Sequence, residues 1–178
     1  MIILPTTYLG PIEWYRQFMA NPAKVAIEVM ESFPKQTYRN RCIITTPDGP
    51  LTLSVPVKRA DSKQLTRDVE ISYQQRWQHQ HWIALMSAYK RTPYFDYYAD
   101  LFRPFYERET KFLVDLNEGL HEVIIRLMEN REPETKSQEQ RIITTIDWSG
   151  QDLDHAFGNG ISILDTLFEY GPETIMKI

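Results

Sequence analysis

Cysteine is nearly absent from this sequence, because Cys42 is the only one among 178 residues. A single cysteine excludes an intramolecular disulfide and a thiolate zinc cluster, and it suits a reducing compartment, so we expect a cytoplasmic protein. Long apolar runs are missing too: none approaches the roughly 20 residues that a helix needs to cross a bilayer. The amino terminus lacks a basic leader and its apolar run stops at Pro5. This predicts neither a signal peptide nor a membrane span.

A strong charge of one sign is also lacking. The formal net charge is −4, with +4 over residues 1–90 and −8 over residues 91–178. The cationic excess of the first half is small for a duplex nucleic-acid protein, so we do not expect a nucleic-acid partner. A phosphorylated small molecule needs fewer cations. The common phosphate, dinucleotide, calcium, zinc and serine-nucleophile motifs do not occur, and we expect neither a metal nor a cofactor.

The length and the 42% hydrophobic content predict one globular domain over residues 1–178. Residues 1–73 are rich in β-type patterns, residues 75–130 are helical in pattern, and residues 141–178 combine a strand with a terminal helix. We therefore predict an α+β fold, in which a small mixed or antiparallel sheet with an amino-terminal hairpin region packs against a carboxy-terminal helical half.

The hairpin is the clearest β signal. RCIITT (41–46) and LTLSVPV (51–57) flank PDGP, a four-residue turn sequence. Alternation places Leu51, Leu53, Val55 and Val57 on one face, and Lys58 ends the polar face. Further strands are expected at MIILPT (1–6), KVAIEV (24–29), RDVEIS (67–72) and RIITTID (141–147), with a helix over 11–22 that starts and ends at prolines.

Helical periodicity marks the second half. The apolar stripe through Trp82, Leu85 and Tyr89 predicts one helix, and a second helical piece follows Pro93 with a break near Pro104. Residues 113–127 keep strict apolar helical spacing and should pack in the core. Residues 129–140 have the composition of a surface linker. Gly171-Pro172 should stop the terminal helix.

Two polar patterns invite a catalytic interpretation. RWQHQHW (76–82) contains His79 and His81, but residues two apart on a helix point about 200° apart, which argues against a shared metal. His81 flanks the apolar stripe, so it is either a hydrogen-bonded boundary histidine or a general acid or base. Ser162 and Asp165 precede an apolar run, and a capping box explains them better than a catalytic pair.

Cations gather at the open end of the predicted hairpin. If the first strand extends back to YRNR (38–41), Arg39 and Arg41 share one face and can form a fork for phosphate or carboxylate. The hairpin geometry brings Lys58, and with it Arg59, to the same end. Cations at strand ends also protect against edge pairing, so this anion site has a structural alternative.

YRNRCIITTPDGPLTLSVPVKR resembles the WbqC-like protein family, which has an Arg-Asn-Arg segment, a hairpin and a Val-Pro-Val-Lys strand end. WQHQHWIALMSAYKRTPYFDYY is similar to the family's Trp-x3-His segment and the Tyr-Lys-x2-Pro-x-Phe after it. FLVDLN and SILDTLFEYGP resemble its leucine-asparagine segment and terminal helix. The residues that the resemblance carries over are Asn40, Arg41, Lys58, Trp77, His81, Tyr89 and Lys90, with Arg39 joined by adjacency.

The chain also departs from the family pattern. The usual Gln-Pro opening is replaced by LPTTYLGPIEWY, which retains only Tyr8, Gly10 and Trp14. An Asp-Asp pair commonly follows the second strand, whereas this chain offers only Glu28 and Glu31. If those acids are catalytic in the family, the activity of this branch is lost or changed.

Family members often occur in gene clusters for O-antigen and other bacterial surface polysaccharides. The resemblance therefore implies a role in making or modifying a sugar, and our leading hypothesis is a transferase-type enzyme that acts on a nucleotide-linked or amino sugar. In this hypothesis Arg39, Arg41 and Lys58 hold phosphate and His81 is the base. The pocket is formed by Tyr8, Trp14, Asn40, Trp77, Tyr89 and Lys90. The alternatives are a non-catalytic binding or assembly protein of the same pathway and, third, a single-stranded nucleic-acid binder. A homo-oligomer is left open.

Overall fold

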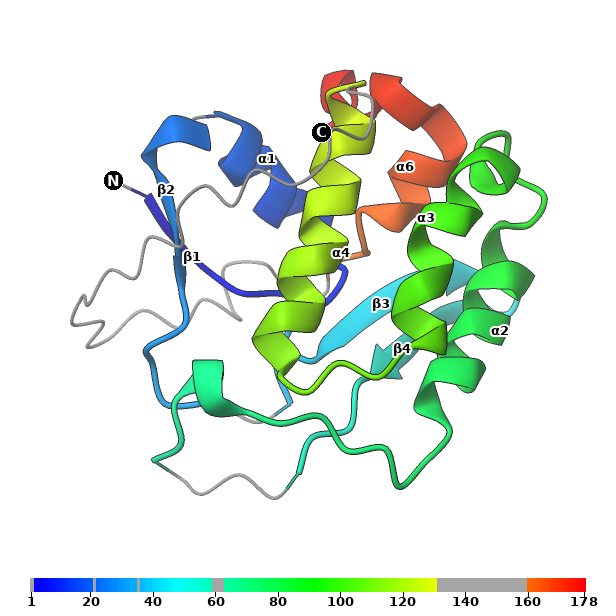
Figure 1. Cartoon of the computed structure of the whole chain (residues 1–178). Helices are drawn as coiled ribbons and strands as arrows, with labels where there is room; N and C mark the ends of the chain where they lie inside the picture. Colours follow the sequence, from blue (N-terminus) through cyan, green and yellow to red (C-terminus); the bar gives the residue numbers. More distant parts are fainter. Residues whose placement is uncertain (1, 21, 35, 59–62, 131–159) are drawn as a thin grey trace.

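The computed structural model describes residues 2–20, 22–34, 36–58, 63–130 and 160–178 (Figure 1). The strand predicted at 141–147, the linker from residue 131 onward and Arg59 lie outside the described residues.

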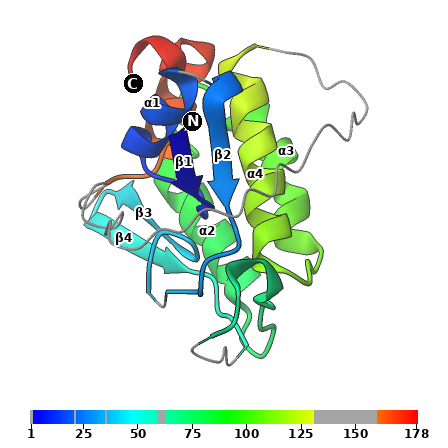
Figure 2. The ribbon, with the colours of Figure 1, turned by 90° about the vertical axis from the view of Figure 1, so that its left-hand side faces the viewer.

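The amino-terminal segment forms a β-α-β unit. Strand β1 (Ile2–Pro5) pairs in parallel with β2 (Val25–Glu28), and helix α1 (Ile12–Ala20) makes the connection between them. Parallel neighbours cannot be joined by a tight turn, so a crossover helix is the expected solution. The short 3₁₀ helix η1 (Pro22–Lys24) leads from α1 into β2. Figure 2 shows the two strands side by side with α4 next to β2. Both strands and the helix confirm the prediction.

The predicted hairpin is present as β3 (Arg41–Thr46) and β4 (Gly49–Ser54), paired antiparallel from Arg41 opposite Ser54 to Thr46 opposite Gly49. The loop holds two residues and not four, because Gly49 at φ 112° already belongs to β4. Leu53 and Val55 are buried as predicted, whereas Leu51 is 40% exposed near the loop. Strand β3 begins at Arg41 and residues 36–40 form turns. Arg39 and Arg41 therefore do not share a strand face.

The strand predicted at 67–72 is wrong. A 3₁₀ helix, η2 (Thr66–Asp68), occupies its start. Beyond it, Glu70 forms a single bridge to Phe112 and Ile71 forms one to Val57. Because neighbouring residues pair with different segments, no continuous ladder develops. The described strands thus form one parallel and one antiparallel pair, and the α+β class is confirmed.

The helical half matches its periodicity. Helices α2 (Trp77–Tyr89), α3 (Phe95–Glu107) and α4 (Leu113–Met128) lie within the predicted range. Helix α3 runs through Pro104 without the predicted break: the proline carbonyl still accepts from the Arg108 amide, at 3.0 Å, which continues the helix to Glu107. Among the described residues, no helix is long and apolar enough to cross a membrane.

The carboxy-terminal elements are α6 (Leu164–Tyr170) and the 3₁₀ helix η3 (Gly171–Met176). Gly171 at φ 56° ends α6, as predicted. The predicted capping box between Ser162 and Asp165 is wrong. In such a box the Ser162 amide would donate to the Asp165 carboxylate, but here it donates to the Ile43 carbonyl, at 2.7 Å. The Asp165 carboxylate instead accepts from the Thr45 amide, at 3.3 Å, and from the Tyr89 hydroxyl, at 3.1 Å. These bonds attach α6 to the hairpin and to α2.

Helix α4 lies near the middle of the molecule, between the β-α-β unit and α3 (Figure 1). Its buried residues are Leu113, Leu116, Asn117, Leu120, Ile124 and Met128. Five of these six are apolar, and the exception, Asn117, donates to Thr6, directly after β1, and to the Arg39 carbonyl.

Candidate functional site

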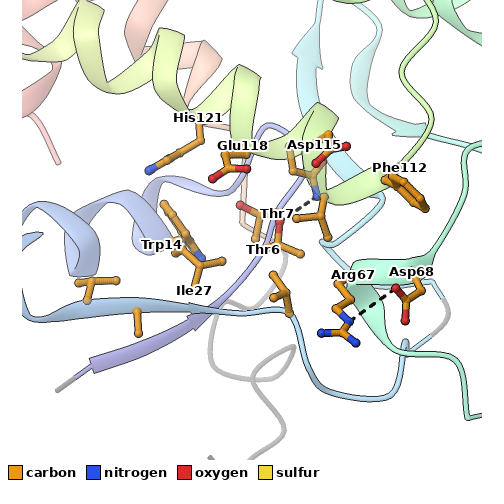
Figure 3. Close-up of a pocket in the computed structure, with 15 residues that line it drawn as sticks. Thr6, Thr7, Trp14, Ile27, Arg67, Asp68, Phe112, Asp115, Glu118 and His121 are labelled. Atoms are coloured by element: carbon orange, nitrogen blue, oxygen red, sulfur yellow. Dashed lines mark hydrogen bonds and ion pairs between the residues drawn. The ribbon is translucent and has the colours of Figure 1, made fainter. Parts of the chain in front are cut away.

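A cavity of about 440 Å³ lies between α4, β2, α1 and η2 (Figure 3). Its volume falls within the range that small-molecule sites occupy, about 300–1,000 Å³. The lining residues are Thr6, Thr7, Trp14, Val25, Ala26, Ile27, Val29, Arg67, Asp68, Phe112, Val114, Asp115, Asn117, Glu118 and His121. Trp14 is the one member that the sequence had predicted for a pocket.

Helix α4 supplies the polar wall. Asp115, Glu118 and His121 are spaced by three residues and therefore project from neighbouring positions along one side of the helix. Figure 3 shows their side chains along α4 above the cavity, with Trp14 and Ile27 opposite. Two carboxylates and an imidazole thus face an apolar and aromatic wall.

Trp14 is held in a fixed orientation. Its indole Nε1 donates to the Pro5 carbonyl at 2.9 Å, and its ring stacks on Phe18 at a centroid distance of 5.5 Å. His121 meets the Trp14 ring edge to face, at 5.1 Å. Burial lowers the pKa of His121 to about 4. The imidazole is therefore neutral at pH 7 and can accept a proton.

The amide of Asn117 joins the cavity to the Arg-Asn-Arg segment. Its Nδ2 donates to the Arg39 carbonyl at 2.8 Å and to Thr6 Oγ1 at 3.2 Å. Because the Arg39 carbonyl can only accept a hydrogen bond, the Asn117 atom beside it must be the amide nitrogen. The remaining atom, Oδ1, is buried and has no hydrogen-bond partner among the described residues. Thr6 Oγ1 uses a lone pair for Asn117, so its own proton remains to be donated.

Arg67 and Asp68 lie at the end of the cavity away from His121 (Figure 3). The Arg67 Nε is 3.5 Å from Asp68 Oδ1, and both side chains are about half exposed. Such an exposed pair contributes little stability. In the part of the chain that the structure describes, no three His, Cys, Asp or Glu side chains gather as a metal site.

His81 belongs to a separate buried cluster. Its Nδ1 is 2.9 Å from the Tyr8 hydroxyl, which is also 2.9 Å from the Tyr106 hydroxyl, and Trp77 meets the ring edge to face at 5.1 Å. Burial lowers the pKa of His81 to about 4, against an opposing hydrogen bond to the Ser54 backbone. The structure thus brings Tyr8, Trp77 and His81 together, outside the residues that line the cavity. His79 is exposed, as helical geometry predicted.

Two of the three predicted anion ligands, Arg39 and Lys58, bind different carboxylates. Arg39 forms a bidentate pair with Glu31, with Nε–Oε1 at 2.5 Å and Nη2–Oε2 at 3.0 Å. Lys58 Nζ lies 2.6 Å from Glu70 Oε2. Arg41 begins β3 and is half-buried. Their role as phosphate ligands stays a prediction.

The other predicted pocket residues have structural contacts. Asn40 Nδ2 donates to the Val55 carbonyl at 3.0 Å and so joins the open ends of the hairpin. The Tyr89 hydroxyl binds Asp165, and burial is the largest cause that raises the pKa of this phenol. Lys90 is exposed just after α2.

Sequence reasoning missed the cavity residues of α4. One signal was available: Asn117 occupies a core position, four residues after Leu113 and three before Leu120, where an apolar side chain is expected. It also lies in FLVDLN, the segment that resembles the family's leucine-asparagine motif. Asp115 and Glu118 carry no such signal, since acids on a helix are ordinarily solvated.

Comparison with known families matches residues 7–149 to the WbqC-like protein family. The match covers well over half of the 178 residues, so the chain belongs to this family. Neither a curated protein nor a solved structure matches the chain.

Proposed function

We propose that this member of the WbqC-like family is a cytoplasmic transferase-type enzyme of bacterial surface polysaccharide biosynthesis, O-antigen-like in kind. It binds the sugar part of a nucleotide-linked or amino sugar in the cavity beside α4 and transfers a group to or from it. The observation that carries the proposal is the placement of two carboxylates and a neutral imidazole opposite an aromatic wall, in a cavity of about 440 Å³.

The chemistry of the lining suits a sugar. A sugar ring has apolar C–H faces and a rim of hydroxyl or amino groups. The Trp14 ring offers a flat apolar surface, while Asp115, Glu118 and Thr7 offer acceptors and a hydroxyl. A mostly apolar cavity with a few directed polar groups is the usual form of a small-molecule site.

His121 is the base in this proposal. It lines the cavity, and its lowered pKa keeps the ring neutral at pH 7. A neutral imidazole can take the proton from an attacking hydroxyl or amine. The earlier hypothesis for His81 stays a prediction, and the contacts of His81 with Tyr8 and Trp77 give that histidine a structural role as well.

Thermal unfolding against a panel of nucleotide sugars, amino sugars and oligonucleotides tests binding. A ligand at 100 times its Kd adds about 2.7 kcal/mol to the free energy of unfolding, which raises Tm by about 5–10 °C at this chain length. We expect such a shift with at least one sugar. A shift with RNA and none with any sugar contradicts the proposal.

Turnover is tested by mass spectrometry after incubation of the bound sugar with activated acyl and glycosyl donors. The His121→Gln variant should lower the rate by at least about 100-fold and leave the sugar-induced Tm shift in place. His79→Gln is the matched control, because His79 is exposed and does not line the cavity.

A non-catalytic binding or assembly protein of the same pathway is the second candidate. The acid that ends β2 and the one that follows it favour this candidate, since both make structural contacts: Glu31 pairs with Arg39, and Glu28 Oε1 accepts from the Met30 amide at 2.5 Å. Sugar-induced stabilisation without turnover of any donor supports this candidate over the enzyme.

A further inference from the structure

Strand β2 supplies an apolar floor to the cavity. Val25, Ala26 and Ile27 of β2 line it, and Val29 continues the lining just after the strand. Val25 and Ile27 are two residues apart, so their side chains share one face of the strand. Glu28, the polar residue in this stretch, is 5% exposed and lies outside the lining. The strand thus turns its β-branched side chains, and not its acid, to the cavity.

The side chains of this floor are only partly covered by the protein. Val25, Ile27 and Val29 are each half-buried, although valine and isoleucine are among the residue types most often fully buried. Phe112 and Val114, at the start of α4, line the same cavity and are half-buried as well. Apolar side chains that share a cavity in this way are the usual lining of a small-molecule site.

The floor is elongated. The four residues of β2 span about 10 Å, which accommodates a chain of several CH₂ groups. In Figure 3, Trp14 and His121 lie at one end of the cavity and Phe112 lies at the other. A sugar ring bound at Trp14 and His121 therefore leaves part of the floor to another part of the ligand.

An aliphatic chain is the ligand group that matches this floor. A hydroxyl-rich ring placed there would lose its water without gaining hydrogen-bond partners from valine and isoleucine side chains. A nucleobase binds by stacking on aromatic rings and by hydrogen bonds at its edge, and the β2 side chains offer neither. A chain of CH₂ groups gains from each contact with them, because the removal of apolar surface from water is favourable.

We propose that Val25, Ile27 and Val29 form the floor of an aliphatic-chain subsite, so that the ligand of the cavity is a sugar that carries an acyl or alkyl chain. The sugar part of this ligand rests on the proposed function, and the chain rests on the apolar floor. The ring lies at Trp14 and His121, and the chain runs along β2. The substrate class is thereby narrowed from any nucleotide-linked or amino sugar to one that bears an aliphatic chain.

The test uses the full chain with ¹³C-labelled isoleucine and valine methyl groups and measures Kd by chemical-shift titration. Each buried CH₂ group tightens binding by about fourfold, so butyl β-D-glucoside should bind up to about 60-fold more tightly than methyl β-D-glucoside. The methyl signals of Ile27 should shift. Those of Ile83, which is 52% exposed on α2 and does not line the cavity, should not.

A second pair of ligands identifies where the chain is attached. N-butanoyl-D-glucosamine has two more CH₂ groups than N-acetyl-D-glucosamine and should bind up to about 16-fold more tightly. A gain in this pair supports an acyl group on the sugar, and a gain in the glucoside pair supports an alkyl chain at the anomeric oxygen. If neither pair shows a gain of at least about fourfold, the value for one CH₂ group, the inference is overturned.

Hexan-1-ol separates this inference from the proposed function. If the sugars bind and neither pair shows a gain, the chain subsite fails and the sugar proposal stands. If no sugar binds, and hexan-1-ol shifts the methyl signals of Ile27 but not those of Ile83, the chain subsite stands and the sugar proposal fails. If none of the five compounds binds, both are overturned.

A pair of variants assigns the chain to β2. Ile27→Thr keeps the β-branch, removes apolar surface from the floor and should lower the gain from the longer chain by at least about threefold. Ile83→Thr is the matched control, because it makes the same change outside the cavity and should keep the gain. A gain that Ile27→Thr leaves unchanged overturns the assignment to β2. If Ile27→Thr does not fold, the ligand series and the methyl shifts of the unchanged chain decide.

Discussion

Replacing Arg39 or Glu31 by methionine tests whether the Arg-Asn-Arg segment serves structure or phosphate binding. The side chain of Arg39 is 5% exposed and that of Glu31 is 23% exposed, with a bidentate pair between them. Removing one partner of a buried ion pair costs about 3–5 kcal/mol, because the other charge is left without compensation. Methionine matches glutamate in length but is shorter than arginine, so the cost of Arg39→Met also includes some lost packing.

The two single variants should differ in a defined order. Arg39→Met leaves the Glu31 carboxylate, which is partly open to water, so the cost falls near about 3 kcal/mol. Glu31→Met leaves a guanidinium that is almost fully enclosed, and the cost approaches about 5 kcal/mol. The double variant replaces two buried charges by an apolar contact and should be more stable than either single variant.

Urea unfolding followed by tryptophan fluorescence measures these differences, and a double-mutant cycle gives the coupling. Lys58→Met is the control, because the Lys58–Glu70 pair is 63% and 32% exposed and should contribute under about 1 kcal/mol. Our reasoning is refuted if Arg39→Met costs less than about 1 kcal/mol. It is also refuted if Glu31→Met proves the milder change. Arg39 would then be available as an anion ligand.

Three further variants test the described contacts. Burial lowers the pKa of His81 from 6.5 to about 4, so this group should reduce stability by about 3 kcal/mol as pH drops from 6.5 to 4. Because His121 has the same lowered pKa, His81→Asn should remove about half of the pH dependence in the urea midpoint over this range. Tyr8→Phe removes two buried hydrogen bonds and should cost about 2 kcal/mol in urea, and a cost under about 0.5 kcal/mol contradicts it. Gly171→Ala should lower Tm more than Gly49→Ala, because both glycines have positive φ but only at Gly171 does the new Cβ clash with the Tyr94 ring.

Periodicity in the sequence was sufficient to predict helices and strands that bury only one of their faces. Helix α4 buries one stripe of apolar side chains, and burial alternates in β3 at Cys42 and Ile44, so spacing alone predicted these two elements. The segment at 67–72 alternates equally well, yet it makes isolated bridges to Phe112 and Val57. A sequence pattern reports which residues are buried, and it does not report whether one continuous partner strand buries them.

The cavity could not be predicted in the same way, because it is assembled from five separate stretches of the chain. The cations near the open end of the hairpin, Arg39, Arg41 and Lys58, belong to no apolar periodic pattern, and they were interpreted from the sequence as anion ligands. In the structure, Arg39 and Lys58 each contact a carboxylate from another segment, Glu31 and Glu70. Such pairings depend on tertiary contacts between segments without any fixed spacing in sequence. Trp14, which the sequence predicts for a pocket, lines the cavity, and aromatic side chains are common in both cores and sites.

The Arg-Asn-Arg segment and the cavity are connected through a single side chain. The guanidinium of Arg39 donates to the carboxylate of Glu31, which follows β2. The backbone carbonyl of Arg39 accepts from the Asn117 amide on α4. That bond orients the Asn117 amide, whose oxygen is buried without a hydrogen-bond partner among the described residues. Arg39→Met should therefore also loosen the contact with Asn117, so in a double-mutant cycle its cost and the cost of Asn117→Leu should not add. If the two costs add within about 0.5 kcal/mol, the backbone of Arg39 is held by other contacts and the two roles are independent.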